Sequence, residues 1–241
     1  MREYSPERTH RILFKISGEF LAGGKSRGFD HATIEQIVSD IIEVKRMGVS
    51  IGIVLGGGNI FRGGSETSET VRRIAADNVG MLATVQNSII VAEYLRARNY
   101  QTEIYSAVQI DRMSKLYAPE RAENSLSEGK ICLFCAGTGN PYFTTDTAAV
   151  LRAVELGAHL VLKGTKVDGV FSADPMQDPS AEFIPEISFD DVLSRKLNVM
   201  DMTAFSLARE AGMPIKVFNV TRPGALKDAV LKRDVGTFVH P

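Results

Sequence analysis

The stretch ICLFCAGTGNPYFTTD, residues 131–146, holds the pattern that decides the fold. Residues 131–136 form an apolar run typical of a strand buried in a parallel sheet. Residues 147–155 have the apolar spacing of a helix. Between them lies a loop of glycines, an amide and hydroxyls that ends at a helix N-terminus, where free N–H groups and the helix dipole favour an anion. The stretch therefore predicts an α/β fold with a pocket for a small phosphorylated molecule.

Strand and helix patterns alternate on both sides of this stretch. Strands are predicted at residues 11–17, 50–55, 100–107, 130–136, 159–163 and 214–219. Helices are predicted at residues 30–47, 69–98, 119–128, 147–156, 191–196 and 204–211, the first capped by Asp30 and the second broken near residues 78–80. Residues 164–174 predict a hairpin or a loop laid over the sheet, and a last helix and strand follow Pro223. This order predicts a three-layer αβα sandwich around a mainly parallel central sheet.

Composition limits the classes of function. Hydrophobic residues make up 44% and charged residues 24% of the 241 residues, which is ordinary for a globular protein, and no linker interrupts a single predicted domain. The formal net charge of −1 provides no positive field for nucleic acid or an acidic membrane. No apolar stretch approaches a membrane span, and residues 1–10 lack the apolar core of a signal peptide. A cytoplasmic location is therefore expected.

The two cysteines, Cys132 and Cys135, have the spacing of a redox or metal motif. They lie inside a predicted strand, where residues three apart point to opposite faces, and no second pair completes a metal site. Two buried, reduced thiols are the better interpretation, and no metal site is predicted from protein side chains.

Three loops that follow predicted strands are candidates for binding phosphate. The first contains Lys15, whose ammonium inside an apolar strand requires either an anion or a route to solvent at the strand end. The second, residues 56–62, has three consecutive glycines that let backbone N–H groups approach a phosphate, with Arg62 able to clamp it or to remain a solvent-facing side chain. The third ends at Asp146, for which helix capping is the simpler alternative.

The blocks with specific order and spacing are KISGE at 15–19, GGGNIFRG at 56–63, Asp77 with MLAT at 81–84, AGTGNPYFTTD at 136–146, LKGTKVDGV at 162–170 and VMD at 199–201. Together they resemble the amino acid kinase family, and within it the bacterial-type UMP kinases. The resemblance covers residues 11–237 and implies ATP-dependent, Mg²⁺-assisted phosphorylation of UMP to UDP. It places the UMP side of the single domain mainly in residues 11–162 and the ATP side mainly in 163–241.

The resemblance also implies roles for individual residues. The transfer centre would contain Lys15, Asp146, Lys163 and Asp201. UMP would bind Gly57, Asp77, Thr138, Gly139, Asn140, Pro141, Tyr142, Phe143, Thr144 and Thr145. ATP would bind Lys15, Ile16, Ser17, Gly18, Gly58, Arg62, Thr165, Phe171 and Asp174. Relatives imply a homohexamer with GTP as activator and UTP as inhibitor, and they place GTP regulation at residues 23–28, whose sequence departs from theirs.

Two other functions are consistent with these residues. One is a related phosphotransferase with a carboxylate or carbamate acceptor. The other is a nucleotide-sensing or anion-storing protein without turnover. Single residues also have simpler interpretations: Asp77 as a solvated helix face, Thr138 and Thr145 as turn residues, and the apolar helix positions Ile89, Ile90 and Leu95 as core instead of subunit contact.

Overall fold

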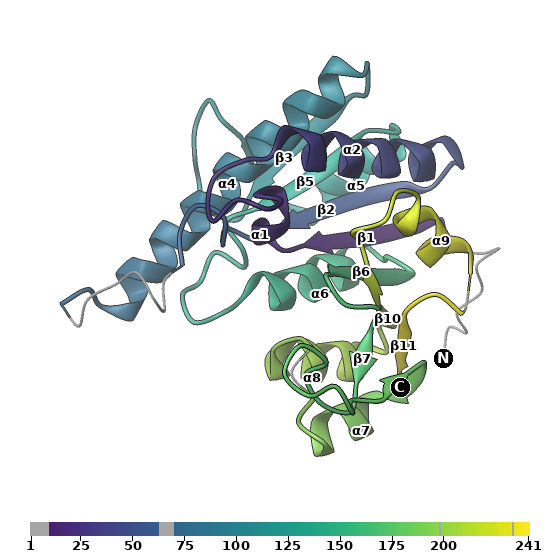
Figure 1. Ribbon diagram of the computed structural model, residues 1–241. Coiled ribbons are helices and arrows are strands. Elements are labelled where there is room, and N and C mark those ends of the chain that lie inside the picture. Colours follow the sequence, from purple (N-terminus) through teal and green to yellow (C-terminus); the bar gives the residue numbers. More distant parts are fainter. Residues whose placement is uncertain (1–9, 63–69, 198, 233) are drawn as a thin grey trace.

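The computed structural model describes residues 10–62, 70–197, 199–232 and 234–241 (Figure 1). Within these ranges one central sheet has nine strands. Their spatial order is β4 (Lys115–Leu116), β3 (Thr102–Ser106), β5 (Ile131–Cys135), β2 (Ser50–Leu55), β1 (Arg11–Ile16), β6 (Leu160–Thr165), β10 (Ile215–Asn219), β11 (Thr237–His240) and β9 (Glu186–Ser188). Neighbouring strands are parallel except β10 and β11. The predicted mainly parallel sheet is confirmed.

Helices cover both faces of this sheet (Figure 1). They are α1 (Gly18–Leu21), α2 (His31–Arg46), α4 (Arg73–Ala97), α5 (Pro119–Ser127), α6 (Thr145–Glu155), α7 (Phe189–Ser194), α8 (Met202–Ala211) and α9 (Ala225–Leu231). Alternate residues of β1 enter two cores: Phe14 packs with residues of α2, α4 and α9, whereas Leu13 packs with residues of α5, α6 and α8. The three-layer α/β sandwich is therefore confirmed.

Side-chain caps explain where several helices begin. Asp30 accepts a hydrogen bond from the Thr33 amide at 3.0 Å at the start of α2, as predicted. Thr144 caps α6, Ser188 caps α7 and Asp201 caps α8. Each cap satisfies N–H groups that have no partner inside their helix. These caps start α6 and α7 two residues before the predicted positions.

The predicted break near residues 78–80 is wrong, because α4 runs without interruption from Arg73 to Ala97. A β-carbon at Gly57 would lie 2.9 Å from the Gly80 carbonyl oxygen and 2.8 Å from the Ala83 side chain, so the glycine loop packs directly against this part of the helix. Tertiary packing therefore offsets the ~1 kcal/mol by which glycine weakens a helix. The sequence also left the short strands β4 and β9 unpredicted. The hairpin or loop predicted at residues 164–174 includes only the first strand of the observed hairpin, because β7 (Val170–Phe171) pairs with β8 (Phe183–Ile184) further along the chain.

Buried charges of opposite sign hold the two ends of α9. Asp40 of α2 accepts from the amide of Gly224, the N-cap residue, at 2.9 Å. Lys216 of β10 donates to the carbonyl oxygens of Ala229 and Lys232 at 3.0 and 2.6 Å. A negative charge at the N-terminus and a positive charge at the C-terminus both suit the helix dipole.

Cys132 and Cys135 are buried and not joined to each other, as predicted. Leu95 belongs to the core, and Ile89 and Ile90 pack partly against it, which favours the core interpretation of these positions. Across the described ranges, every helix is too short or too polar to cross a bilayer.

Candidate functional site

Two lysines lie side by side at the carboxyl ends of adjacent central strands. Lys15 on β1 and Lys163 on β6 are register partners in the parallel sheet, so their side chains leave the same face. Both residues are buried. Two neighbouring buried ammonium groups repel each other and require a shared anionic partner.

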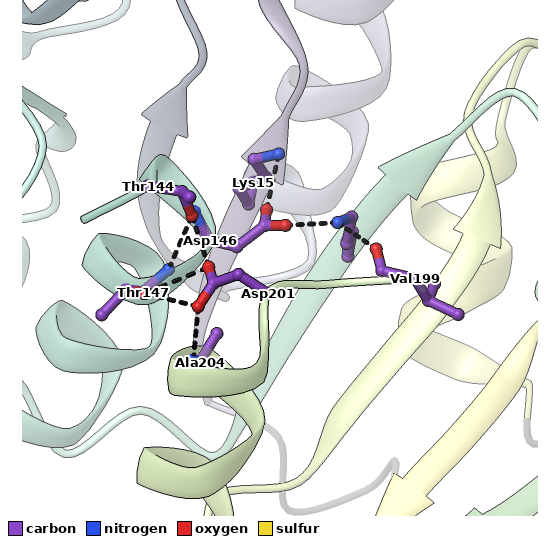
Figure 2. A network of polar contacts seen from close by, with 8 residues as sticks. Lys15, Thr144, Asp146, Thr147, Val199, Asp201 and Ala204 are labelled. Carbon is purple, nitrogen blue, oxygen red and sulfur yellow. Dashed lines mark hydrogen bonds and ion pairs between the residues drawn. The ribbon is translucent and has the colours of Figure 1, made fainter. Parts of the chain in front are cut away.

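Asp146, in the first turn of α6, contacts both lysines, and Figure 2 shows its carboxylate beside Lys15. Its Oδ1 is 2.6 Å from Lys15 Nζ and its Oδ2 is 2.5 Å from Lys163 Nζ. The Lys15 contact is an ion pair. Lys163 also donates to the carbonyl oxygen of Val199. One carboxylate therefore organises both cations, and Lys163 reaches further to the segment before α8.

Burial and charge act against each other at this centre. Burial alone would raise the pKa of Asp146, but the neighbouring charges of Lys15 and Lys163 outweigh it and lower that pKa. Burial lowers the pKa of Lys163, and the attraction of Asp146 opposes that change only in part. The carboxylate is thus held in its charged form, while Lys163 retains its proton less strongly than a lysine in water.

Asp201 lies at the junction of α6 and α8 (Figure 2). It caps α8 by accepting from the Ala204 amide at 2.8 Å. The same carboxylate accepts from the Thr147 hydroxyl at 2.9 Å and from the Thr144 hydroxyl. Thr144 in turn caps α6, so the alternative of Asp146 as that cap is wrong. The contacts of Asp201 fasten two helices, and its contribution to the lysine centre is electrostatic, since its charge raises the Lys163 pKa.

The loop after β2 is locked in place by close glycine packing and by a buried amide pair. A β-carbon at Gly18 would come within 2.5 Å of the Gly56 carbonyl oxygen, so the loops after β1 and β2 touch along their backbones. Asn59 and Asn87 exchange side-chain hydrogen bonds at 3.0 and 2.7 Å, and Asn87 also donates to Gly56 at 2.6 Å. Both amides are buried. The resemblance did not include Asn87, whose only sequence signal is a polar residue within an apolar helix.

The loop after β5 is fastened to α4. The Ala136 amide donates to the Thr84 hydroxyl at 2.8 Å. Further along, the Tyr142 amide donates to Asp77 Oδ2 at 2.8 Å, and Arg73 pairs with the same carboxylate at 3.0 Å. Asp77 therefore makes specific contacts across the site, beyond those of a solvated helix face.

The other residues predicted to bind the acceptor occupy this loop or its neighbour. Thr138 accepts from the Asn140 amide at 3.2 Å, and Gly139 has a φ of 84°, so this part is a tight turn. Tyr142 and Phe143 are exposed aromatic residues. Pro141 lies between them and the turn, and Thr145 is the first residue of α6.

The residues predicted to bind the donor fall into two groups. Ile16 is buried at the end of β1, Ser17 is the N-cap residue of α1, and Gly18 is the first residue of that helix. Gly58 accepts from Arg62 Nε at 3.2 Å, and Arg62 also pairs with Glu19 at 3.1 Å.

The second group begins at the end of β6 and continues into the segment that follows it. The Thr165 hydroxyl donates to the Val167 carbonyl at 2.6 Å. Phe171 of β7 makes an edge contact with Phe183 of β8, at 5.5 Å between ring centroids. Asp174 accepts from the Met176 amide at 2.9 Å, as a turn residue does. The residues predicted to bind the donor therefore lie in two regions, one at the end of β1 and in the loops after β1 and β2, the other at the end of β6 and after it.

An open cleft of about 350 Å³ lies beside the second group, between α1, α2 and the strand ends of β6 and β10. Its lining residues are Phe20, Gly23, Gly24, Ala32, Thr33, Gln36, Lys166 and Thr221. Lys166 directly follows Thr165, yet none of the predicted donor residues lines the cleft. The residues described form no cluster of three or more acidic, histidine or cysteine side chains suited to a metal ion.

The two lysines and Asp146 are suited to bind an anion whose charge shifts during a reaction, such as a phosphoryl group in transfer. Two buried ammonium groups held by Asp146 lie at the carboxyl edge of the sheet, beside glycine loops and the N-terminus of α6. Such preorganised positive groups stabilise a phosphoryl group in transfer without reorganising during the reaction.

Comparison with known proteins agrees with this chemistry. The sequence profile of the Amino acid kinase family matches residues 10–219. The crystal structure of UMP kinase from Bacillus anthracis superposes with a TM-score of 0.93 and 34% identity, covering 96% of each chain. UMP kinase from Ureaplasma parvum gives a TM-score of 0.91 and 35% identity, covering 97% of this chain and 100% of that one. Uridylate kinase from Archaeoglobus fulgidus, at a TM-score of 0.73 and 24% identity over 95% and 99% of the two chains, shares the fold.

Proposed function

The chain belongs to the amino acid kinase family, and from this membership and the site geometry we propose that it phosphorylates UMP to UDP with ATP. The observation that carries the proposal is the pair of buried lysines joined by Asp146. The similarity to two UMP kinases over nearly the whole chain selects the acceptor. An acetylglutamate, carbamate or other acceptor would use the same lysine centre but lacks this support.

The acceptor chemistry requires no general base. The second pKa of a phosphate monoester is about 6, so UMP is mostly a dianion at neutral pH and attacks directly. The difficulty is to bring two anions into line and to stabilise the charge on the moving group. We assign this task to Lys15, Lys163 and the N–H groups of the glycine loops, with Mg²⁺ arriving as part of the nucleotide substrate. Asp146 would position the two lysines.

The two substrates would occupy different halves of the single domain. Residues 11–162 would bind UMP through Gly57, Asp77 and the loop 138–145. Residues 163–241 would bind the adenosine of ATP near Thr165, Phe171 and Asp174, and the ATP phosphates would cross to residues 15–18, Gly58 and Arg62. Asp201 would act indirectly, by holding the N-termini of α6 and α8 together.

A homohexamer activated by GTP and inhibited by UTP remains part of the proposal. Exposed apolar side chains on the first half of α4 support self-association: Ile74, Val79 and Leu82 are 46%, 44% and 52% exposed. Clusters of exposed apolar residues are typical of protein contacts. Sedimentation tests the assembly, and the rate of ADP release with and without GTP or UTP tests the regulation.

A panel of acceptors tests the catalytic proposal. ADP release would be measured with ATP and Mg²⁺ and with UMP, CMP, acetylglutamate or carbamate. UMP should give the highest kcat/KM. Lys15→Met should lower kcat by about 10²–10³-fold, the usual size of losing one preorganised charge, whereas Lys227→Met, at an exposed lysine of α9, should not change it. Binding of both nucleotides without ADP release would instead support a sensing protein, and preference for another acceptor would overturn the UMP assignment.

A further inference from the structure

The carboxylate of Asp77 serves two partners from different parts of the chain. Arg73 Nε lies 3.0 Å from each carboxylate oxygen, one turn earlier on α4. The Tyr142 amide, from the loop after β5, donates to Oδ2 at 2.8 Å. A carboxylate has about four lone-pair sites, and these three contacts leave Oδ1 able to accept one more hydrogen bond. Asp77 is only partly buried, so that site is accessible.

Arg73 also contacts the loop directly. Its guanidinium carbon lies 5.2 Å from the centroid of the Tyr142 ring, within the range of a cation–π interaction. An exposed ion pair between residues four apart on a helix contributes little by itself. Here the guanidinium of Arg73 contacts both the Asp77 carboxylate and the Tyr142 ring. The same carboxylate accepts a hydrogen bond from the Tyr142 amide and so helps to position that ring. Arg73, Asp77 and Tyr142 therefore form a closed set of three contacts.

The backbone of Tyr142 requires such fastening. Its φ is 72°, in the left-handed region that a bulky residue rarely adopts. Its side chain is 63% exposed, so core packing does not hold the residue there. Positions with this kind of backbone persist where surrounding contacts determine them, and they are frequent at ligand-binding sites. The hydrogen bond to Asp77 and the contact with Arg73 are the contacts that do so.

We propose that Arg73 is a positioning residue for the acceptor: it orients the Asp77 carboxylate toward a ribose hydroxyl and seats the loop 138–144 at the same time. This inference rests on the proposed function, since it names how that acceptor site distinguishes its substrate. Recognition of the hydroxyl and the position of the loop then depend on one carboxylate. Arg73 would thus favour ribonucleotide acceptors over 2′-deoxyribonucleotides without touching either.

The test compares Arg73→Gln, Arg73→Lys and Arg72→Gln, with UMP and with 2′-deoxy-UMP as acceptors at saturating ATP. Arg72 is the exposed neighbour that precedes α4 and serves as the matched control. Arg73→Gln should raise the KM for UMP about tenfold, the size of one weakened charge-assisted hydrogen bond, with kcat and the KM for ATP unchanged. The KM for 2′-deoxy-UMP should rise clearly less, so that the difference in KM between 2′-deoxy-UMP and UMP becomes smaller. Arg73→Lys, which keeps the charge without the planar group, should restore part of that preference.

Three results would overturn the inference while leaving UMP phosphorylation intact. The first is an Arg73→Gln variant no different from Arg72→Gln. The second is an equal rise in KM for both acceptors, which a general disturbance of the loop predicts. The third is a fall in kcat at unchanged KM. If Arg73→Gln fails to fold, as judged by circular dichroism, Arg73→Lys replaces it in the comparison. A ratio of the KM for 2′-deoxy-UMP to the KM for UMP equal to that of Arg72→Gln would then overturn the inference. A wild-type protein inactive on UMP would instead refute the proposed function itself.

Discussion

Replacing Asp146 by asparagine tests the electrostatics of the candidate transfer centre. The carboxylate lies 2.6 Å from one ammonium group and 2.5 Å from the other. The three side chains are only 8–12% exposed, so solvent screens these ion pairs little. Asparagine retains one acceptor oxygen for one lysine, turns an amide NH2 donor toward the other and removes the negative charge from both.

The expected loss of stability is about 3–5 kcal/mol near pH 7, the typical result of removing one partner from a buried ion pair. At least one charge-assisted hydrogen bond, worth about 1.5–3 kcal/mol, is lost outright. The remainder comes from two buried cations that lose the carboxylate they share. An exposed ion pair gives a matched control: Asp190→Asn breaks the contact with Arg209 at 2.8 Å, where Asp190 is 79% exposed. That loss should be about 0–1 kcal/mol.

The pH dependence distinguishes charge from packing. The stability that wild-type Asp146 contributes is present above its unfolded pKa and is lost as pH falls through its lowered folded pKa. In the variant, the pKa of Lys163, already lowered by burial, loses the opposing attraction and falls further. Lys163 then sheds its proton at lower pH, so stability relative to wild type recovers as pH rises. The deficit of Asp146→Asn should therefore be smaller near pH 9.5 than near pH 7.

Urea unfolding followed by circular dichroism, at one protein concentration, measures both quantities. A deficit as small as that of Asp190→Asn would refute the buried-charge account of the site. A large deficit that does not change between the two pH values would show that lost packing, and not the unpaired ammonium groups, causes the effect.

Three further outcomes are expected elsewhere in the molecule. Lys216→Met should destabilise the protein by about 2–4 kcal/mol in urea unfolding, because two carbonyl groups at the end of α9 lose a buried donor; a loss within error would mean that water replaces the ammonium. Burial raises the pKa of Asp40 above its usual 3.8, so the stability that its neutral form contributes is lost as pH rises through the raised value. Asp40→Asn should therefore gain thermal stability relative to wild type between about pH 4 and pH 7, and a difference independent of pH would contradict this. Burial raises the pKa of Cys132 and of Cys135 to about 12, so iodoacetamide at pH 8 should label both thiols only after unfolding; rapid labelling of the native protein would contradict their burial.

Much of the fold could be predicted because central parallel strands are apolar on both faces and end at glycine-rich turns. The failures share a physical cause, which is that the deciding contact lies far away in the sequence. Gly80 is a weak helix residue locally, yet α4 continues because the loop at Gly57 packs on it. The strand β4 is two residues long and exposed, and its pairing partner β3 alone defines it.

In the candidate site, too, some residues could be selected from the local sequence and others only from contacts between distant segments. Lys15 could be selected from the sequence because an ammonium inside an apolar strand needs an explanation, and Asp146 because it ends a candidate phosphate loop. The resemblance added Lys163 and the role of all three in a transfer centre. That all three touch is a property of the tertiary structure. Arg73 and Asn87 could not be selected, since an exposed arginine and a helical asparagine are ordinary residues until their partners are known. The catalytic and binding roles of the predicted residues remain predictions.

The strand register that makes Lys15 and Lys163 partners limits how the length of this chain can change. One residue added to or removed from β6 ahead of Lys163 would turn that side chain to the opposite face of the sheet, away from Asp146. The loop between β7 and β8, residues 172–182, has no comparable register to keep. Insertions and deletions that arise during evolution should therefore collect in that loop and be absent from β6. In β6 the number of residues before Lys163 determines whether its ammonium lies beside Lys15 and Asp146.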